Sequence, residues 1–320
     1  MSIKLIDYPS VIPLAKYDSL KTKLVNELLS DNAILSIYQM GSVKDPGISD
    51  LDIICVFKNN SENRTDYRKE LSLNEKMILT HGLFGVEQKD LSITIPYNLL
   101  SNLQLLGGEN LHLNKIEVSK NQILKTQIAI EYLLKMFITL DTQKTLKIVK
   151  LRSFLLLAKA ISLDLELLNI SEGKLYDLVQ KVFYFRSKWF SNQPKKMEIR
   201  TLILEFHKEI TLLLEQLFKE EKFYLPLKDI KLPGNFDIKR GDSFHHNHKG
   251  IVLPSPFKFL GKKYINLQYR LNQFQYFIPF ELPEDGSVLK NRFEFTQYLV
   301  DKNRIQYPSF LPIMSSLSIY

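Results

Sequence analysis

The sequence predicts an α+β protein in which a small mixed sheet with flanking helices precedes a helical bundle and a β-rich C-terminal region. Three observations lead to this class. Short apolar strands alternate with helical segments in the first third, apolar residues recur at helical spacing in the middle third, and Pro, Gly and aromatic residues punctuate the last third. We expect domains at residues 1–118, 119–222 and 223–320.

The first third predicts one amphipathic helix and several strands. Apolar residues at helical spacing, from Leu14 to Leu28, predict a helix over about residues 13–31. Two β-rich runs follow, "AILSIYQM" and "LDIICVF", and a polar stretch at 63–79 is compatible with a helix. The later runs "GLFGVE" and "KDLSITI" predict two more strands, and the second of them also alternates apolar and polar residues.

The middle third predicts a helical bundle over about residues 119–220, and the last third predicts short strands. The clearest apolar stripe runs from Ile199 to Leu217. Near the C-terminus, "YINLQYRL" alternates apolar and polar residues and predicts a strand, with "YFIPFEL" as its partner across the connection "NQFQ". Pro279 in the second run favours an edge strand or a bulge.

Composition excludes several classes of protein. The chain has 320 residues, 45% of them hydrophobic and 24% charged, which is typical of a folded globular protein and excludes global disorder. A single cysteine, Cys55, excludes an internal disulfide framework. The N-terminal residues lack the apolar core of a signal peptide, and no apolar run is long enough to cross a membrane. We therefore expect a cytoplasmic protein without a membrane partner.

Charge is distributed unevenly along the chain. Residues 1–118 hold 12 Lys/Arg and 15 Asp/Glu, residues 119–220 hold 17 and 11, and residues 221–320 hold 14 and 9. An acidic first third beside basic later thirds indicates a cation site and surfaces suited to phosphates. Uneven surface charge without a function is the alternative interpretation.

The stretch "QMGSVKDPGISDLDIICVF" contains the most informative group of polar residues. A β run ends at Gly41 and Ser42, a turn follows, and a second strand begins with Asp50 and Asp52, whose carboxylates share one face because they are two residues apart. Gly41 lets the backbone approach an anion, and Ser42 adds a hydroxyl for phosphate oxygens. Two carboxylates on one face suit Mg²⁺, which prefers oxygen ligands. A hairpin with solvated acids is the alternative.

These residues resemble the signature of the polymerase-beta-like nucleotidyltransferase superfamily, which is an apolar strand, Gly-Ser, a short spacer and Asp-apolar-Asp. The resemblance implies a nucleotidyltransferase-type mixed sheet and a third carboxylate on a later strand. Asp90 in "KDLSITI" is the best match for that carboxylate, and Glu87 is the substitute. The spacer between Ser42 and Asp50 has seven residues, near the short end for the superfamily.

The resemblance also implies an enzyme that uses two-metal phosphoryl transfer, with Mg²⁺ or Mn²⁺ and a nucleoside triphosphate (NTP) as substrate. Asp50, Asp52 and Asp90 would bind metal, and Asp90 would help to deprotonate the attacking hydroxyl. Gly41 and Ser42 would hold the β- and γ-phosphates while attack on the α-phosphorus expels pyrophosphate. RNA is slightly favoured as the acceptor because the later thirds are basic, and a protein hydroxyl or a small molecule is the alternative.

Further cations are candidates for contacts with the nucleotide. Lys44 lies in the turn, where it either adds positive charge near the phosphates or is solvated. Lys147 and Lys150 lie three residues apart on a predicted helix, and Arg152 and Lys159 are the strongest phosphate-binding candidates of that segment. A solvated helix face is the alternative. The residues that either stack on a base or form a helical core are Tyr184, Phe185, Arg186 and Trp189.

The segment "SFHHNHKG" contains His245, His246 and His248. On a strand, His246 and His248 share a face and could bind Zn²⁺. The sequence favours a polar loop, or a phosphate contact beside Arg240 and Lys249, because only Asp242 is nearby to complete a metal site.

Two other functions remain open at the level of the sequence. One is a catalytically inactive nucleotidyltransferase-fold protein that acts as a binding or scaffolding module. The other is a nucleic-acid-binding module formed by the C-terminal third, whose aromatic residues and positive charge suit such a partner.

Overall fold

The computed structural model describes residues 3–226, 234–260 and 262–314. The protein is α+β, as the sequence predicts. The chain divides into two compact units, a sheet unit of residues 10–124 and 285–314 and a helical unit of residues 3–9 and 125–284. None of the helices in the described ranges has the length and apolar character needed to cross a bilayer.

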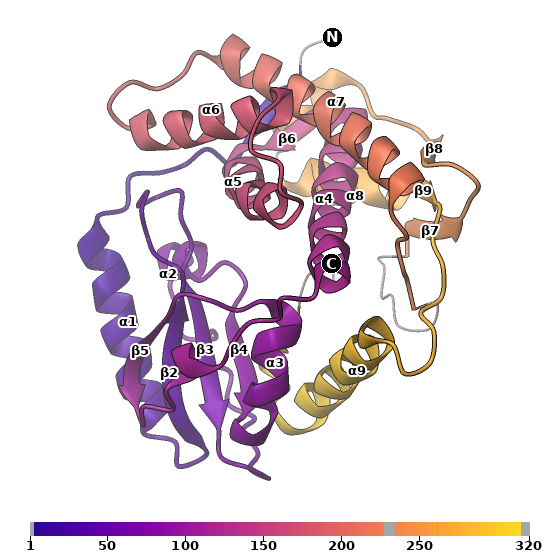
Figure 1. Cartoon of the computed structure of the whole chain (residues 1–320). Coiled ribbons are helices and arrows are strands. Elements are labelled where there is room, and N and C mark those ends of the chain that lie inside the picture. The colour runs from indigo at the N-terminus through magenta and orange to yellow at the C-terminus, as the bar shows by residue number, and fades with distance from the viewer. Residues whose placement is uncertain (1–2, 227–233, 261, 315–320) are drawn as a thin grey trace. The chain divides into compact units, whose positions relative to one another are not determined.

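The sheet unit is built on a five-stranded sheet with the strand order β10-β4-β3-β2-β5. Figure 1 labels strands β4, β3, β2 and β5 of this sheet. Strand β2 pairs antiparallel with β3 and β5, whereas β4 is parallel to both β3 and β10. The strands are β2 (Ile34–Met40), β3 (Asp52–Phe57), β4 (Leu83–Glu87), β5 (Leu103–Gly108) and β10 (Phe310–Pro312). The sheet is therefore mixed, with an antiparallel half and a parallel half.

Helices cover both faces of this sheet. Successive side chains of a strand point to opposite faces, so neighbouring residues of β3 pack against different helices. Tyr17 and Leu24 of α1 (Leu14–Leu29) lie in one core cluster with Ile53 of β3. Leu91 of α3 (Leu91–Asn98) lies in a second cluster with Ile54 of β3. The other helices of this unit are α2 (Leu73–Ile78), η1 (Gln88–Asp90), η2 (Leu113–Lys115) and α9 (Val288–Gln306).

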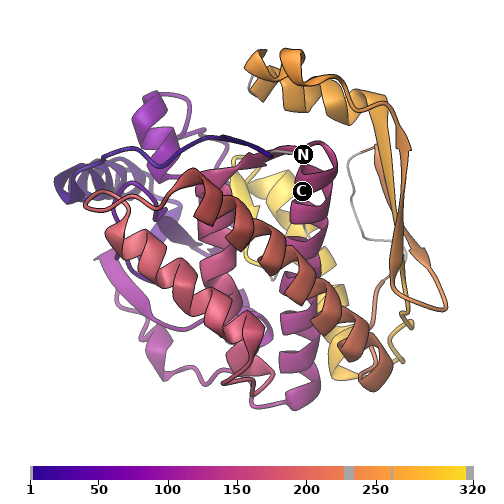
Figure 2. The same cartoon turned by 90° about the horizontal axis from the view of Figure 1, so that it is seen from above.

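The helical unit contains the predicted bundle. Its main helices are α4 (Gln122–Thr145), α5 (Leu151–Leu167), α6 (Lys174–Lys188) and α7 (Lys196–Glu220). Helix α6 contacts both α5 and α7, and Figure 2 shows α6 and α7 side by side. Strand β1 (Lys4–Ile6) pairs in parallel with β6 (Ile148–Lys150), so the N-terminal segment belongs to this unit.

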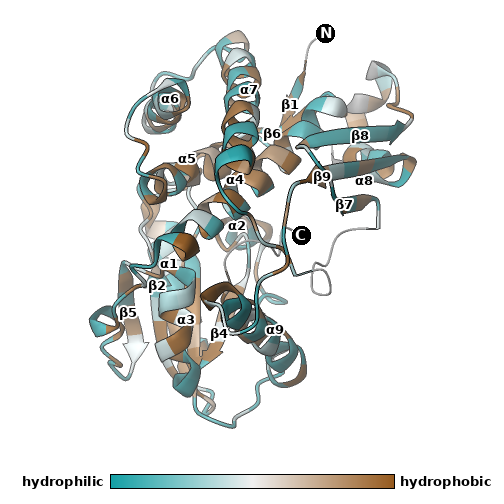
Figure 3. Ribbon diagram, turned by 45° about the vertical axis from the view of Figure 1, so that its right-hand side comes forward, coloured by the Kyte–Doolittle hydropathy of each residue, from teal (hydrophilic) through white to brown (hydrophobic). Residues whose placement is uncertain are grey.

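A three-stranded sheet of order β7-β9-β8 follows the bundle in the same unit. Its strands are β7 (Phe236–Arg240), β8 (His245–Gly250) and β9 (Asn272–Ile278), and between β8 and β9 the chain forms η3 (Ser255–Leu260) and α8 (Lys262–Leu271). Strand β8 is hydrophilic along its length (Figure 3) because its sequence is "HHNHKG".

The division into units differs from the three consecutive domains that the sequence predicts. Residues 285–314 return to the sheet unit, where β10 adds a strand beside β4. The predicted boundary at 118/119 lies close to the break after Leu124, whereas the boundary at 222/223 has no counterpart in the division. A pairing between strands more than two hundred residues apart leaves no local pattern in the sequence.

The prediction of a strand for "KDLSITI" is wrong, because this segment forms η1 and the start of α3. Leu91 and Ile95 are buried, whereas Ile93 between them is 43% exposed. Residues four apart share a helix face, so the same alternating sequence satisfies a helix once Ile93 faces outward. Asp90 and Thr94 are also buried.

The prediction of a strand for "YINLQYRL" is wrong for the same reason. Residues 264–271 lie in α8, where Tyr264, Ile265 and Gln268 are buried and Leu267 and Leu271 are exposed. The predicted connection "NQFQ" is the first part of β9. Two other segments also differ from the prediction. Within the helix-compatible stretch at 63–79, only α2 is an α-helix. Lys147 and Lys150, which the sequence predicts on a helix, precede α5, because Lys147 has a φ of 56° and Lys150 lies in β6.

Mutations can distinguish a helix from a strand at residues 262–271, because the two structures bury different side chains. Ile265→Ala removes a buried side chain and should destabilise the helical unit by about 2–5 kcal/mol. Leu267→Ala changes an exposed side chain and should stay within about 0.5 kcal/mol of the parent. Urea unfolding followed through the single tryptophan, Trp189 in the same unit, measures both. Equal losses for the two variants would contradict the helix.

Candidate functional site

The antiparallel pair of β2 and β3 brings the Gly-Ser element and the acid pair to one edge of the sheet. Met40, the last residue of β2, is paired with Asp52, the first residue of β3. Gly41 and Ser42 therefore leave the sheet where Asp50 and Asp52 enter it. Asp50 precedes the strand, so the predicted strand start at Asp50 moves to Asp52.

Gly41 adopts a φ of +70°, a conformation that favours glycine, and a Cβ at this position would meet no atom within 4 Å. The space in front of Gly41 is thus open. Its own N–H donates to the carbonyl of Asn102 at 3.1 Å, so this amide is already used within the sheet unit. The Ser42 hydroxyl is exposed and makes no hydrogen bond within the described residues. An anion at this turn would therefore meet Ser42 first.

The turn between Ser42 and Asp50 is hydrogen-bonded to Tyr17, a fully buried residue of α1. The Tyr17 hydroxyl donates to the carbonyl of Ser49 at 2.8 Å and accepts from the N–H of Gly47 at 2.9 Å. The turn is also closed on itself, because the N–H groups of Ile48 and Ser49 donate to the carbonyl of Asp45. The seven-residue spacer is consequently a compact, anchored turn.

The acid pair lies at the surface of this edge. Leu51 and Ile53 are buried, whereas Asp50 and Asp52 are half-buried. The N–H of Leu51 donates to the carbonyl of Ile78 at 2.9 Å, which fixes the chain between the two acids. Both carboxylates thus point away from the core at the entry of β3.

His81 is the titratable neighbour of this pair that the sequence interpretation missed. Its Nε2 lies 3.5 Å from Oδ2 of Asp50, and its side chain is 54% exposed. In the parallel β3–β4 pair Ile53 lies opposite Leu83, so the residues just before Leu83 lie beside those just before Ile53. The sequence signal was its position directly before an apolar strand, but only the strand register gives that position a meaning.

Asp90 and Glu87 lie at the opposite edge of the sheet. Because β3 and β4 are parallel, Glu87 is paired with Phe57 at the far end of β3, and Asp90 follows it in the chain. The structure therefore does not bring Asp90, or its substitute Glu87, to Asp50 and Asp52.

Glu87 and Asp90 instead form a buried ion cluster with Lys302 of α9. The Lys302 ammonium lies 2.9 Å from Glu87 Oε2 and 2.7 Å from Asp90 Oδ2, and Lys89 lies 3.0 Å from Glu87. Burial lowers the pKa of Lys302, but its hydrogen bonds to Asp90, Tyr298 and Glu87 outweigh burial and hold the pKa well above its ordinary 10.5. Burial raises the pKa of Glu87, yet hydrogen bonds from Lys302 and Lys89 bring it below its ordinary 4.5.

The other predicted phosphate ligands lie in two places. Lys44 is exposed on the turn that follows Ser42. Arg152 and Lys159 belong to α5 of the helical unit, where Arg152 is buried and Lys159 is half-buried, and their contact with a nucleotide stays a prediction. Among the candidates for stacking on a base, Phe185 and Trp189 are buried in the helical core together with the cation Arg186, whereas Tyr184 is exposed.

The histidines of β8 have separate partners in the helical unit. Nε2 of His246 lies 3.4 Å from the buried carboxylate of Asp141, and Nε2 of His248 lies 2.8 Å from the Asn272 side chain. Asp141 also contacts Nε2 of His207 at 3.0 Å, while Nδ1 of His207 faces the Lys144 ammonium at 3.2 Å. A lysine can only donate, so His207 accepts through Nδ1 and donates to Asp141 through Nε2.

Across the described ranges, no group of three or more His, Cys, Asp or Glu side chains is arranged to hold a metal ion. This finding applies also to His246 and His248, for which Zn²⁺ binding is the less favoured interpretation of the sequence.

Comparisons of this chain with protein-family models, with curated proteins and with solved structures find no match.

The ion cluster at Lys302 makes a prediction about stability. Lys302→Met would leave Glu87 and Asp90 buried with only Lys89 as a counter-charge, and the free energy of unfolding should fall by about 3–5 kcal/mol. The raised pKa of Lys302 contributes stability below pH 10.5 that is lost as the pH rises through the folded value. The lowered pKa of Glu87 contributes stability above pH 4.5 that is lost as the pH falls through the folded value.

The deficit of Lys302→Met should therefore be full at neutral pH and shrink in acid, as measured by urea unfolding followed by circular dichroism. Lys290→Met is the matched control, because Lys290 lies on the same helix and forms a surface ion pair with Glu294 at 3.7 Å. A loss of about 0–1 kcal/mol is expected for it. Similar deficits for both variants would contradict the cluster.

Proposed function

We propose that the protein is a metal-dependent nucleotidyltransferase that moves a nucleoside monophosphate from an NTP to a hydroxyl acceptor. The observation that supports this proposal is the register of β2 and β3, which pairs Met40, two residues before Ser42, with Asp52, two residues after Asp50. A hydroxyl and two carboxylates at one exposed edge offer groups for both the phosphates and a cation.

The two carboxylates fit Mg²⁺ or Mn²⁺ without a third acid. Mg²⁺ commonly binds through one or two carboxylates, keeps several waters and takes substrate phosphates as further ligands. Asp50 and Asp52 are half-buried, so their oxygens are accessible at the surface of the edge. When bound with the NTP, the metal supplies positive charge that stabilises the charge developing on the phosphates.

The residues of the turn would orient the triphosphate. Ser42 is exposed and donates a hydroxyl to a phosphate oxygen, and Lys44, exposed two residues further on, adds positive charge near the leaving pyrophosphate. Because Gly41 uses its amide within the sheet unit, its contribution is the open space in front of the backbone. Asp50 and Asp52 would hold the metal that neutralises charge on the phosphates.

His81 is our candidate for the proton-accepting role that the resemblance assigns to Asp90. Its imidazole contacts Asp50 at 3.5 Å, and 54% of its side chain is exposed to an incoming acceptor. A neutral imidazole can take the proton of the attacking hydroxyl while the adjacent carboxylate stabilises the imidazolium that forms.

A second candidate function is nucleotide binding without transfer. The position of Asp90 at the opposite edge favours it, because the resemblance implies a third carboxylate at the site of an active enzyme. Binding and transfer make different predictions for the same variants.

Asp50→Asn tests the proposed activity. Incubation of the wild-type chain with Mg²⁺, α-labelled NTPs and a panel of RNA, protein and small-molecule acceptors should give labelled product, and Asp50→Asn should lose at least about a hundredfold of that rate. Asp18→Asn, which changes a surface acid of α1, is the matched control. If the wild type binds NTP but labels no acceptor, binding without transfer is the function.

His81→Gln tests the proton acceptor. The variant should keep its affinity for the NTP and lose about 10²-fold or more in kcat, the typical contribution of a general base. The acidic limb of the pH–rate profile should disappear with it. An unchanged kcat and an unchanged pH profile would remove His81 from the mechanism.

A further inference from the structure

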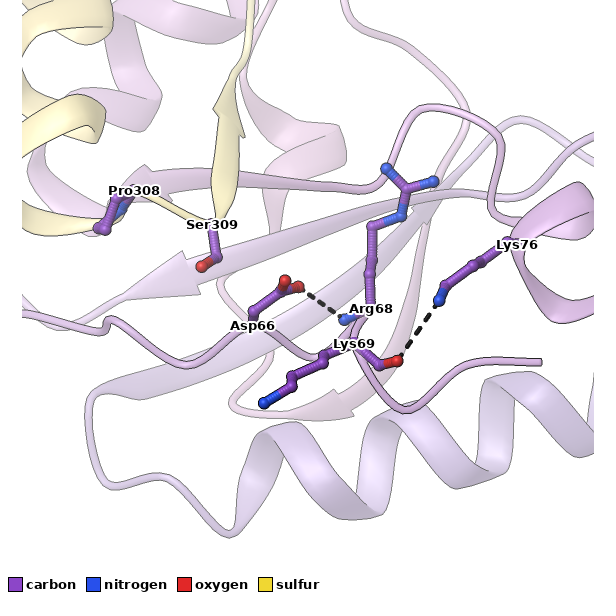
Figure 4. A pocket seen from close by; sticks show the side chains of 6 residues that line it. All are labelled: Asp66, Arg68, Lys69, Lys76, Pro308 and Ser309. Carbon is purple, nitrogen blue, oxygen red and sulfur yellow. Dashed lines mark hydrogen bonds between the residues drawn. The ribbon is translucent and has the colours of Figure 1, made fainter. Parts of the chain in front are cut away.

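A depression of about 370 Å³ lies in the sheet unit and is lined mainly by cations and by the residues that precede β10 (Figure 4). Its lining residues are Asp66, Arg68, Lys69, Lys76, Pro308 and Ser309. Its volume is at the lower end of the range for small-ligand sites.

The depression opens at the same edge of the sheet as the acid pair. Ser309 directly precedes Phe310, the first residue of β10, which is paired with Leu83 at the start of β4. Leu83 is in turn paired with Ile53 at the start of β3. The entries of β10, β4 and β3 therefore form one continuous edge, with the depression near β10 and Asp50 beside β3.

Arg68 connects the two parts of this edge. Its guanidinium donates to the carbonyls of Leu79 at 3.3 Å and Thr80 at 3.5 Å. The next residue is His81, whose ring contacts Asp50. The cations and the acid pair are thus neighbours, linked by the short segment before β4.

The cations of the depression have no carboxylate partners. Within the described residues, Arg68, Lys69 and Lys76 form no ion pair, and the Lys76 ammonium donates only to the carbonyl of Lys69 at 3.4 Å. Nε of Arg68 is buried without a hydrogen-bond partner. Asp66 is the acid of the lining, and its Oδ1 accepts from the Arg68 N–H at 3.0 Å. The lining keeps an excess of positive charge, which suits a phosphate.

The direction of the proposed reaction gives this phosphate a role. Phosphoryl transfer places the attacking and leaving groups roughly in line on opposite sides of the phosphorus. Ser42 and Lys44 belong to the turn that follows the end of β2, and in the proposed reaction they hold the leaving pyrophosphate. The attacking hydroxyl must then arrive from the β4 and β10 side, on which the depression lies.

We propose that the depression binds a backbone phosphate of a nucleic-acid acceptor and so positions the hydroxyl that attacks at Asp50 and Asp52. The inference rests on the proposed function and specifies its acceptor. An uncharged small molecule would leave the charges of Lys69 and Lys76 without a counter-charge, whereas the phosphodiesters of a nucleic acid supply oxygens for both at every nucleotide.

The test measures binding in the absence of turnover. Full-length chains that carry Asp50→Asn are titrated against a labelled short single-stranded oligoribonucleotide, and binding is followed by fluorescence anisotropy over a range of salt concentrations. Lys69→Gln with Lys76→Gln should raise Kd about tenfold or more, since both charge-assisted contacts to the phosphate are lost. The slope of log K against log salt should fall by about 0.7 for each lost contact.

The matched control removes two lysines outside the depression, Lys58→Gln with Lys115→Gln, both exposed in the same unit. It should leave Kd within about twofold, because unspecific charge contributes weakly at physiological salt. Equal weakening by the two double variants would reduce the effect to net charge and overturn the inference. Absence of oligonucleotide binding would also overturn it.

The outcome is separable from that of the proposed function. If the wild type transfers nucleotides but the variants of Lys69 and Lys76 raise only the KM for NTP, the depression binds the triphosphate. The inference about the acceptor then fails, while the proposed function stands. If no transfer is found but the oligonucleotide binds through Lys69 and Lys76, the binding site stands and the proposed reaction fails.

Discussion

The parallel pairing of β3 with β4 determines the separation between the acid pair and the ion cluster of the sheet unit. Ile53 pairs with Leu83 and Phe57 with Glu87, so the two strands enter at one edge and leave at the other. At about 3.3 Å per residue, these paired ends are roughly 13 Å apart. One edge consequently receives Asp50 and His81, and the other receives a cluster of carboxylates neutralised by lysine. The same register separates the partly exposed pair of Asp50 and His81 from the buried carboxylates of Glu87 and Asp90.

Those parts of the fold that depend on local pattern could be predicted from the sequence. The strands at Ile34–Met40 and Asp52–Phe57 and the helix at Leu14–Leu29 follow directly from apolar spacing and turn residues. Segments such as "KDLSITI" could not be assigned, because apolar residues at every second position also supply pairs four apart. The neighbours of the acid pair were beyond prediction, since they depend on the register between strands and on β10, which returns from the far end of the chain.

Buried charges connect distant segments in both units. Lys302 joins α9 to the end of β4, and in the helical unit Asp141 of α4 contacts His207 of α7 and His246 of β8. A buried charge is tolerated only when it is paired, and loss of one partner leaves the other at a high cost in free energy. Each cluster therefore makes the correct docking of a late segment a condition for satisfying an earlier one. In this way the polar interior specifies the arrangement within each unit, and the apolar core supplies the driving force.

The hydroxyl of Tyr17 restricts the conformation of the turn between Ser42 and Asp50, and this has a consequence for the affinity of the proposed site. It is donor to one residue of the turn and acceptor from another, so the turn cannot change length or open without losing both bonds. Ordering a loop residue costs about 1–2 kcal/mol of conformational entropy. That cost has been met here during folding, so the proposed triphosphate site would offer a rigid surface. Insertions in this turn would therefore act mainly on the entropy of the proposed binding, even though they alter none of the groups proposed to contact the phosphates.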